Sequence, residues 1–271
     1  MTSEDTTGGV SRSTSFGAIA RDYDRYRPGP PVEALAWILP SPCRSALDIG
    51  AGTGALTRLL VPTVELVLAV EPDPRMASVM AAEVPSAEVM MARAEQIPLR
   101  SACLDAVVGS SMWHWVDEGQ AAWEAARVLR PGGVLGVLWS GPDRSQPWLG
   151  DLLARARPEE TADGRGHRRR LHLPDGAPFT EPESRVMSWS VTMAPDHLLE
   201  LAFTYSRFIV LPEAEKMRRR QAMEEYGRRH ETRGGSADIE VPMQAICWRA
   251  VRTAQGHRSS KTNPAPRSRP W

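Results

Sequence analysis

Cysteine is scarce in this chain, which has three in 271 residues. Cys43, Cys103 and Cys247 are widely spaced and form no Cys-x-x-Cys pair, so the sequence predicts neither a disulfide framework nor a zinc site. No other metal site is indicated. A chain with so few cysteines is expected in the reducing cytoplasm.

Excess charge of one sign and long apolar runs are also absent. The 33 basic and 33 acidic residues balance, so no overall field attracts nucleic acid or a membrane surface. Only Lys216 and Lys261 are lysines; the other basic residues are arginines. No apolar stretch approaches the roughly 20 residues of a membrane span, and the polar N-terminus lacks an apolar signal region. We therefore expect no membrane and no nucleic-acid partner.

The length suffices for one large domain with an inserted cap. Composition divides the chain into four parts. Residues 1–15 are rich in Ser, Thr and Gly and are expected to be disordered, and so is the basic Ser/Pro-rich tail 252–271. Between them we expect a core at 16–140 and an insertion with closing strands at 141–251.

The stretch 45–56 organises the rest of the chain. It begins with an apolar run typical of a buried strand and ends with leucines at helical spacing. Between them stand Gly50, Gly52 and Gly54, at positions where no Cβ atom keeps the backbone from a ligand. Strand, glycine turn and helix form the geometry in which N–H groups face a nucleotide.

A second apolar stretch, 64–70, ends at Glu71-Pro72. This pattern predicts a buried parallel strand with a carboxylate at its tip, about twenty residues after the first glycine, where a ribose diol can donate hydrogen bonds. NAD and S-adenosylmethionine both carry that diol, so Glu71 does not choose between them. An ordinary solvated acid at a strand end is the alternative.

Strands and helices alternate along the first half of the chain, which predicts a doubly wound sheet with right-handed crossovers. Further strands are expected at 88–92, 104–109 and 134–139, and helices at 30–39, 55–60, 74–83 and 118–129. Ligands of such sheets bind beyond the carboxyl ends of the strands. Five candidate residues lie at those ends: Asp48, Gly50, Glu71, Ala94 and Ser110.

Five motifs occur in a fixed order. They are Leu-Asp-x-Gly-x-Gly-x-Gly at 47–54, Val-Glu-Pro at 70–72, Ala-Glu-x-Ile-Pro at 94–98, Leu-Asp-Ala-Val-Val at 104–108 and Leu-Arg-Pro-Gly-Gly at 129–133. Together they resemble the class I S-adenosylmethionine (SAM)-dependent methyltransferases, with a methyltransferase type 11 domain, and most of all the small-molecule branch of ubiquinone/menaquinone-type and trans-aconitate-type enzymes. The resemblance covers roughly residues 16–140. It implies a Rossmann-like α/β fold with a seven-stranded sheet, an antiparallel last strand pair and a helical cap on the substrate side.

The resemblance also implies a cofactor site. Asp48 would orient the methionine end of SAM, Glu71 would take the ribose hydroxyls, and Ala94 with Glu95 would lie at the adenine. The implied cofactor-binding residues are Asp48, Gly50, Ala51, Gly52, Gly54, Glu71, Pro72, Ala94, Glu95 and Ser110, with Ser111 beside the last. One position departs from the pattern: many relatives carry an acidic residue where this chain has Arg93.

Residues 16–28 place Phe16, Ile19, Tyr23 and Tyr26 on one helical face. Such a face is typical of a short helix packed on the domain. The resemblance implies instead a lid over the cofactor, which makes Tyr23, Tyr26 and Arg27 candidates for contact with cofactor or substrate.

The segment 110–117 holds two tryptophans that flank a histidine. Trp113 and Trp115 either pack structurally or contact the substrate, and His114 is a candidate general base because histidine titrates near neutral pH. We expect Trp113 and Trp115 on the substrate side.

The region after residue 140 is expected to build the substrate side and close the sheet. His167-Arg168-Arg169-Arg170 is either a solvated loop or a mouth that selects an anionic substrate. The periodicity predicts a short helix around 148–153, strands at 187–193 and 241–251, and helices at 196–210 and 212–229. Tyr205, in the first of these two longer helices, is a candidate substrate contact.

The sequence therefore predicts a SAM-dependent methyltransferase (EC 2.1.1.-) that methylates a small-molecule acceptor by in-line SN2 transfer, with O-methylation favoured over C- or N-methylation. Two alternatives remain. A non-catalytic SAM-binding or regulatory protein would keep the same cofactor residues. An NAD-dependent oxidoreductase would fit the glycine turn but leave the later motifs unexplained.

Overall fold

The computed structural model describes residues 14–156, 169–230 and 238–254. Residues 1–13 and 255–271, which make up most of the two termini predicted to be disordered, lie outside the described residues. His167 and Arg168 of the arginine run do so as well.

Seven strands form one mixed sheet in the order β3-β2-β1-β4-β5-β7-β6. The first five run parallel, and β7 runs antiparallel to both of its neighbours, as predicted for this fold class. The strands are β1 (Ser45–Ile49), β2 (Leu66–Val70), β3 (Glu88–Met90), β4 (Leu104–Ser110), β5 (Leu129–Pro142), β6 (Glu183–Met193) and β7 (Ile239–Val251).

Helices and 3-10 turns connect the strands: η1 (Thr14–Ile19), α2 (Ala20–Tyr26), α3 (Val32–Ile38), α4 (Thr57–Leu60), α5 (Pro74–Glu83), η2 (Trp113–Trp115), α6 (Glu118–Val128), α7 (Pro147–Arg155), α8 (Pro195–Phe203), α9 (Ser206–Ile209) and α10 (Glu213–His230). Asp73 and Asp117 cap α5 and α6 through side-chain acceptors. The single helix predicted at 196–210 is wrong: the structure has α8 and α9, because the chain turns at Thr204, whose hydroxyl donates to the Leu201 carbonyl at 2.7 Å.

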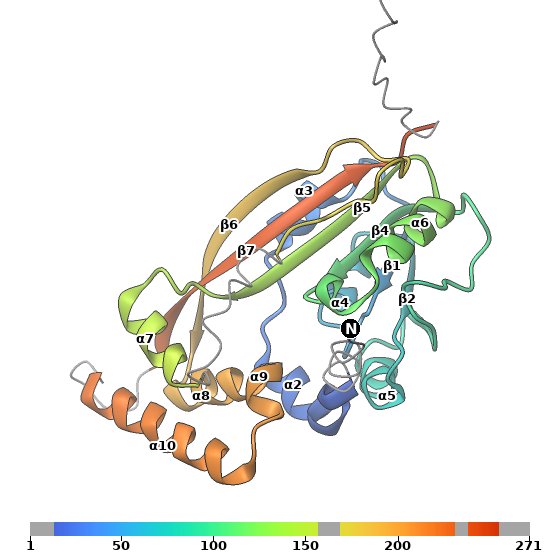
Figure 1. Ribbon diagram of the computed structural model, residues 1–271. Coiled ribbons are helices and arrows are strands. Elements are labelled where there is room, and N and C mark those ends of the chain that lie inside the picture. Colours follow the sequence, from blue (N-terminus) through green and yellow to red (C-terminus); the bar gives the residue numbers. More distant parts are fainter. Residues whose placement is uncertain (1–13, 157–168, 231–237, 255–271) are drawn as a thin grey trace, which may run out of the picture.

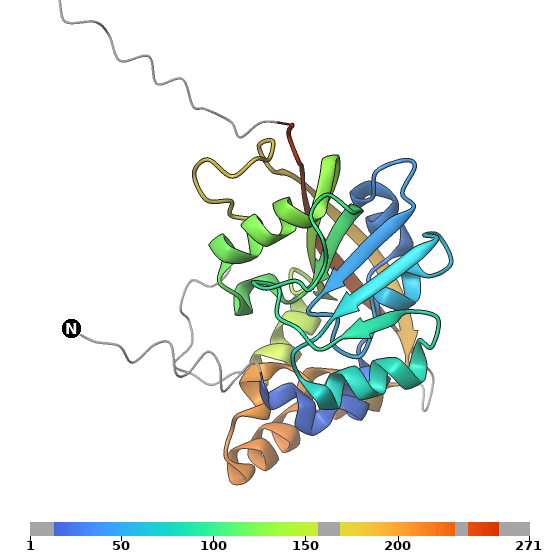
Figure 2. The ribbon, with the colours of Figure 1, turned by 90° about the vertical axis from the view of Figure 1, so that its right-hand side faces the viewer.

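Helices cover both faces of the sheet (Figures 1 and 2). On one face α6 presents a stripe of buried alanines, including Ala121 and Ala125, to Leu47 and Leu135. On the other face Ile38 of α3 and the leucines of α4 pack against β1 and β7, with α5 beside them. Small residues on α6 let its backbone approach the sheet closely.

A second, smaller core lies at one end of the long strands β6 and β7, where α7, α8 and α10 gather (Figure 1). Its buried members include Leu152, Leu201, Met223 and Val241. The strand ends continue from the main sheet into this helical cap, so the cap is fixed to the carboxyl end of β5.

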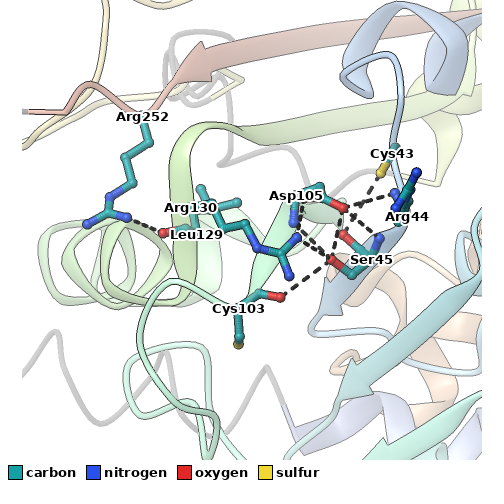
Figure 3. A network of polar contacts seen from close by, with 8 residues as sticks. All are labelled: Cys43, Arg44, Ser45, Cys103, Asp105, Leu129, Arg130 and Arg252. Atoms are coloured by element: carbon teal, nitrogen blue, oxygen red, sulfur yellow. Dashed lines mark hydrogen bonds and ion pairs between the residues drawn. The ribbon is translucent and has the colours of Figure 1, made fainter.

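The amino ends of β1 and β4 are joined by a polar network (Figure 3). Asp105 accepts hydrogen bonds from the backbone N–H groups of Arg44 and Ser45 at 2.9 and 3.0 Å, and it pairs with Arg130. Burial alone would raise the pKa of Asp105, but these hydrogen bonds outweigh it and lower the pKa below its usual value. Two of the sequence motifs, those containing Asp105 and Arg130, therefore meet at the edge opposite the carboxyl ends.

Candidate active site

The glycine turn follows β1 with three left-handed residues. Gly50, Gly52 and Gly54 have φ values of +59°, +60° and +90°, which favour glycine at each position. A Cβ atom on Gly50 would lie 2.9 Å from Cβ of Met112, and one on Gly54 would lie 2.9 Å from Cγ of Met80. Protein side chains thus fill the space beside two of these glycines. Only at Gly52 would a Cβ atom find ordinary contact, 3.4 Å from the nearest side chain.

Glu71 fastens this turn to the tip of β2. Its two carboxylate oxygens accept hydrogen bonds from the backbone N–H groups of Gly52 and Asp73, both at 2.9 Å. Burial raises the pKa of Glu71, and the two backbone hydrogen bonds oppose that rise. Each carboxylate oxygen has a second lone pair, so Glu71 can still accept from ribose hydroxyls. Pro72 follows it on the surface.

Asp48 is a buried carboxyl with one unsatisfied oxygen. Its side chain is 1% exposed, and Oδ2 accepts a hydrogen bond from the Thr57 hydroxyl at 2.7 Å. Oδ1 has no hydrogen-bond partner in the described part of the chain, and neither does the buried hydroxyl of Thr53. Burial raises the pKa of Asp48 to about 7, the Thr57 hydrogen bond opposes this, and the charge of Glu71 adds to it. A buried acceptor without a donor fits a ligand that brings an ammonium group.

Glu95 lies in the turn after β3, and Ser110 is the last residue of β4. Glu95 accepts a hydrogen bond from the backbone N–H of Asp117 at 3.0 Å, so it ties the turn after β3 to the start of α6. Arg93, where relatives carry an acid, pairs with Glu95 at 3.5 Å. Ala94 is buried beside it. Ser110 ends β4, and Ser111 follows with a φ of +56°.

The N-terminal segment η1–α2 crosses these strand ends. On the β2 side Gly17 lies against the Asp73–Arg75 pair, where any Cβ atom would collide with both side chains. On the β4 side the ring of Phe16 meets Trp115 edge-on at 6.1 Å between centroids. Figures 1 and 2 show α2 close to α5 and α9 at this end of the molecule. We refer to η1–α2 as the lid; that it covers the cofactor is a prediction.

The tryptophans and the histidine of η2 separate in the structure. Trp113 is 1% exposed and belongs to the core beneath α6, and its indole N–H has no hydrogen-bond partner among the described residues. His114 and Trp115 are half-buried, with ring centroids 4.8 Å apart. Trp139 of β5 donates its indole N–H to Nδ1 of His114 at 3.1 Å. Trp139 is not among the site residues predicted from the sequence, although its place near the carboxyl end of a predicted strand was a usable signal.

Tyr23 and Tyr205 come together around Arg27. The guanidinium carbon of Arg27 lies 4.8 Å from the centroid of Tyr23 and 4.2 Å from that of Tyr205. Its Nε also donates to the Thr204 hydroxyl at 2.9 Å, which joins the lid to the cap. The guanidinium carbon of Arg144, a residue that no sequence pattern indicated, lies 5.8 Å from the centroid of the Tyr205 ring.

Tyr26 turns away from this group. Its ring meets His197 of α8 edge-on, with 5.0 Å between the centroids, and His197 Nε2 lies 3.3 Å from the carbonyl oxygen of Tyr26. Arg170, from the arginine run, lies over the ring of Trp248 near the carboxyl end of β7, with 5.4 Å between the guanidinium carbon and the ring centroid.

In the described residues, no group of three or more His, Cys, Asp or Glu side chains could hold a metal ion. No helix among the described ranges is long and apolar enough to cross a membrane.

The fold and these buried carboxylates are typical of α/β proteins that bind a nucleotide-type cofactor at the carboxyl edge of the sheet. Residues 47–137 match the family model described as a methyltransferase domain. An uncharacterized methyltransferase of Mycobacterium tuberculosis is 36% identical over 242 residues, which are 88% of this chain and 96% of that protein. The chain therefore belongs to the class I SAM-dependent methyltransferases, and S-adenosylmethionine is its methyl donor.

Solved structures show the same fold. A protein of Anaeromyxobacter dehalogenans, assigned as a type II methyltransferase, superposes with a TM-score of 0.63 at 24% identity, covering 83% of this chain and 97% of that one. A phosphoethanolamine N-methyltransferase of Haemonchus contortus, solved with phosphomonomethylethanolamine and S-adenosylhomocysteine, gives a TM-score of 0.51 at 14% identity, covering 88% and 57%.

Proposed function

We propose that this enzyme methylates a small-molecule acceptor that binds between the lid, η2 and the start of α9. The observation that carries the proposal is the closure of the carboxyl edge: the lid contacts Arg75 on one side and Trp115 on the other, and Arg27 joins it to the cap. A site covered in this way suits a small molecule better than a polymer. The balanced charge of the chain agrees with that choice.

The cofactor would be held by the two buried carboxyls and the glycine turn. Glu71 accepts from the ribose hydroxyls, and Oδ1 of Asp48 accepts from the ammonium of the methionine end. The backbone of the turn lies along the cofactor, and the edge of the adenine lies by Ala94 and Glu95. The remaining members of the proposed cofactor set are Gly50, Ala51, Gly52, Gly54, Pro72 and Ser110.

The methyl carbon of a bound sulfonium is already electrophilic, so the work left to this chain is orientation. The acceptor atom has to lie in line with the S–CH3 bond, and water has to be excluded. His114, Trp115, Tyr23 and Tyr205 come from the elements that surround the proposed acceptor position, and we assign them to the acceptor side. Trp113 and Tyr26 would support these acceptor-side residues without touching the acceptor, because Trp113 is buried in the core and Tyr26 faces His197.

Calorimetric titration tests the cofactor assignment. The parent protein should bind SAM and S-adenosylhomocysteine with micromolar affinity and should not bind NADH. Glu71→Gln keeps the shape but loses the charge, so S-adenosylhomocysteine should bind about tenfold or more weakly, as expected for a lost charge-assisted hydrogen bond of about 1.5–3 kcal/mol.

Glu88→Gln is the matched control, because Glu88 is an exposed acid on the edge strand β3. Equal affinity of the Glu71 variant and the parent would contradict the assignment. Release of S-adenosylhomocysteine only when an acceptor is present distinguishes an enzyme from a protein that merely binds SAM.

A further inference from the structure

The hydrogen bond between Trp139 and His114 fixes the tautomer of the histidine. An indole N–H can only donate, so Nδ1 of His114 must offer a lone pair to it. In the neutral imidazole the proton then sits on Nε2. His114 therefore presents an N–H group through its second nitrogen, whereas a general base acting through Nε2 would need a lone pair there.

We propose that His114 donates a hydrogen bond through Nε2 to the reacting oxygen of the acceptor, and that the acceptor presents this oxygen as an anion, a carboxylate or a phenolate. The proposal rests on the methyltransferase function proposed above and narrows its acceptor to a chemical class. It assigns to His114 the positioning of a nucleophile that arrives already ionised.

Two arginines supply positive charge close to that position. Arg27 and Arg144 both approach the ring of Tyr205, at 4.2 and 5.8 Å from its centroid. Among the residues that the structure describes, neither arginine has a carboxylate within 4.0 Å. Most other arginines at half-buried positions are paired, as Arg127 is with Glu124 and Arg249 with Glu183. Two half-buried cations with no carboxylate partner in the described ranges favour an anionic ligand.

Strand β5 brings the histidine and the arginines to one place. Trp139 and Gly141 are two residues apart and point to the same face, a separation of about 7 Å. Trp139 contacts His114, and the hydroxyl of Tyr205 lies 3.0 Å from where a Cβ atom on Gly141 would be. The residue that contacts His114 and the residue that Tyr205 faces therefore lie on the same face of β5, at its carboxyl end.

A second series of contacts connects Arg27 to His114 through the lid. Arg27 stacks on Tyr23, Tyr23 meets Phe16 edge-on with 5.6 Å between centroids, and Phe16 meets Trp115 beside His114. Contacts thus run from the arginine to the histidine along both β5 and the lid. An acceptor bound between these residues would have the Nε2–H donor of His114 on one side and the cations of Arg27 and Arg144 on the other.

The transfer step balances without a base. A lone pair of the acceptor oxyanion forms the new C–O bond, the S–CH3 bond breaks, and its electron pair neutralises the sulfonium. The negative charge on oxygen and the positive charge on sulfur disappear together, and no proton is moved. A methyl ester or methyl ether and S-adenosylhomocysteine are the products.

Nitrogen-15 NMR of the protein saturated with S-adenosylhomocysteine tests the tautomer directly. The expected spectrum shows neutral His114 protonated at Nε2 and unprotonated at Nδ1. Trp139→Phe removes the indole donor and should give a mixture of tautomers. A neutral His114 protonated at Nδ1 in the parent protein would overturn the proposal, whether or not the Trp139 variant folds.

Matched pairs of probes test the charge requirement in the same complex. Benzoate, phenylacetate and trans-cinnamate are each titrated against the corresponding carboxamide, and 4-nitrophenolate against 4-nitroanisole. At least one anion should bind about tenfold or more tightly than its neutral partner, and the pair that shows this separates carboxylate from phenolate. Absence of any such preference would overturn the anionic acceptor while leaving cofactor binding, measured separately, intact.

Variants then assign the effect to residues. Arg144→Gln should weaken the preferred anion about fivefold or more, whereas Arg21→Gln, an exposed arginine on α2, should leave its affinity unchanged. His114→Gln retains a donor near Nε2 and should bind the anion better than His114→Ala. An unchanged anion affinity in both the Arg144 and the His114→Ala variants would contradict the assignment.

Discussion

At the scale of single residues, two aspartates on neighbouring strands differ in the state that the fold stabilises. Asp48 lies inside β1 with one hydrogen bond and a pKa raised by burial to about 7. Asp105, at the start of β4, has several donors that outweigh its burial and lower its pKa. The fold therefore favours the neutral form of the first and the ionised form of the second, which is consistent with a ligand-binding and a structural role.

We predict opposite pH dependences for their asparagine variants. Because the folded pKa of Asp48 is raised, its contribution to stability is complete below about pH 4 and is lost as the pH rises through about 7. Relative to Asp48→Asn, the parent should thus lose roughly 2–4 kcal/mol of unfolding free energy between pH 4 and pH 7 in urea titrations. If the difference in unfolding free energy between the parent and Asp48→Asn stayed constant over this pH range, Asp48 would be ionised in the folded protein.

Asp105→Asn is the companion variant. The contribution of Asp105 is present above its ordinary pKa and is lost as the pH falls through its lowered folded value, because the hydrogen bonds stabilise the carboxylate. The parent should therefore exceed this variant in stability at pH 7 and lose that advantage in acid. A constant difference down to acid pH would contradict the structural role of the charge.

At the scale of elements, the lid depends on a glycine with no backbone requirement for one. Gly17 has no left-handed φ, yet a Cβ atom there would collide with Asp73 and Arg75. This contact holds the lid against the tip of β2, beside Glu71. The glycine therefore matters because of what it packs against and not because of its own conformation.

Gly17→Ala should displace the lid and accelerate dissociation of S-adenosylhomocysteine several-fold, with little change in the unfolding free energy. Stopped-flow displacement measures the rate. Gly29→Ala is the control, since a Cβ atom there would be 3.4 Å from its nearest neighbour and could be accommodated. Equal dissociation rates for the two variants would show that Gly17 does not secure the lid.

The contact between β5 and α3 shows the same principle inside the core. A Cβ atom on Gly136 would overlap Cγ2 of Ile38. Gly136→Ala should destabilise the protein by about 1–3 kcal/mol through overpacking, and Ile38→Ala by about 2–5 kcal/mol through a cavity. The double variant should lose clearly less than the sum, since each change relieves the other; strict additivity in denaturant titrations would contradict this packing.

At the scale of the whole molecule, the lid connects two cores. Asp24 pairs with Arg58 of α4 in the main domain, while Arg27 bonds to Thr204 of the cap. Cofactor binding beneath the lid should therefore stabilise both parts together. At 100 times its dissociation constant, S-adenosylhomocysteine should add about 2.7 kcal/mol to the unfolding free energy.

Hydrogen exchange locates that stabilisation. With S-adenosylhomocysteine bound, amide protection should rise in residues 14–26 and at the cap helices α8 and α9, as well as in the glycine turn. Arg27→Gln should keep the increase in the turn and reduce it in the cap. Protection confined to the turn in the parent protein would mean that the cap does not respond to the cofactor.

The sequence by itself determined the sheet, and it predicts where the cofactor binds. Apolar runs of strand length, the glycines after β1 and Glu71 after β2 act locally, and neighbouring residues suffice to specify them. The strand alternation also fixed which ends would meet, because the carboxyl ends of parallel strands share one edge.

Only the tertiary structure decided how the acceptor side is built. In the folded chain Trp113 is buried in the core, and His114 accepts a hydrogen bond from Trp139. Arg27 lies between Tyr23 and Tyr205, which come from segments about 180 residues apart. It also showed that Met112 and Met80 lie against two of the signature glycines and that Asp105 and Arg130 join strands at the opposite edge. These outcomes depend on contacts between distant segments, and no local pattern of residue types carries that information.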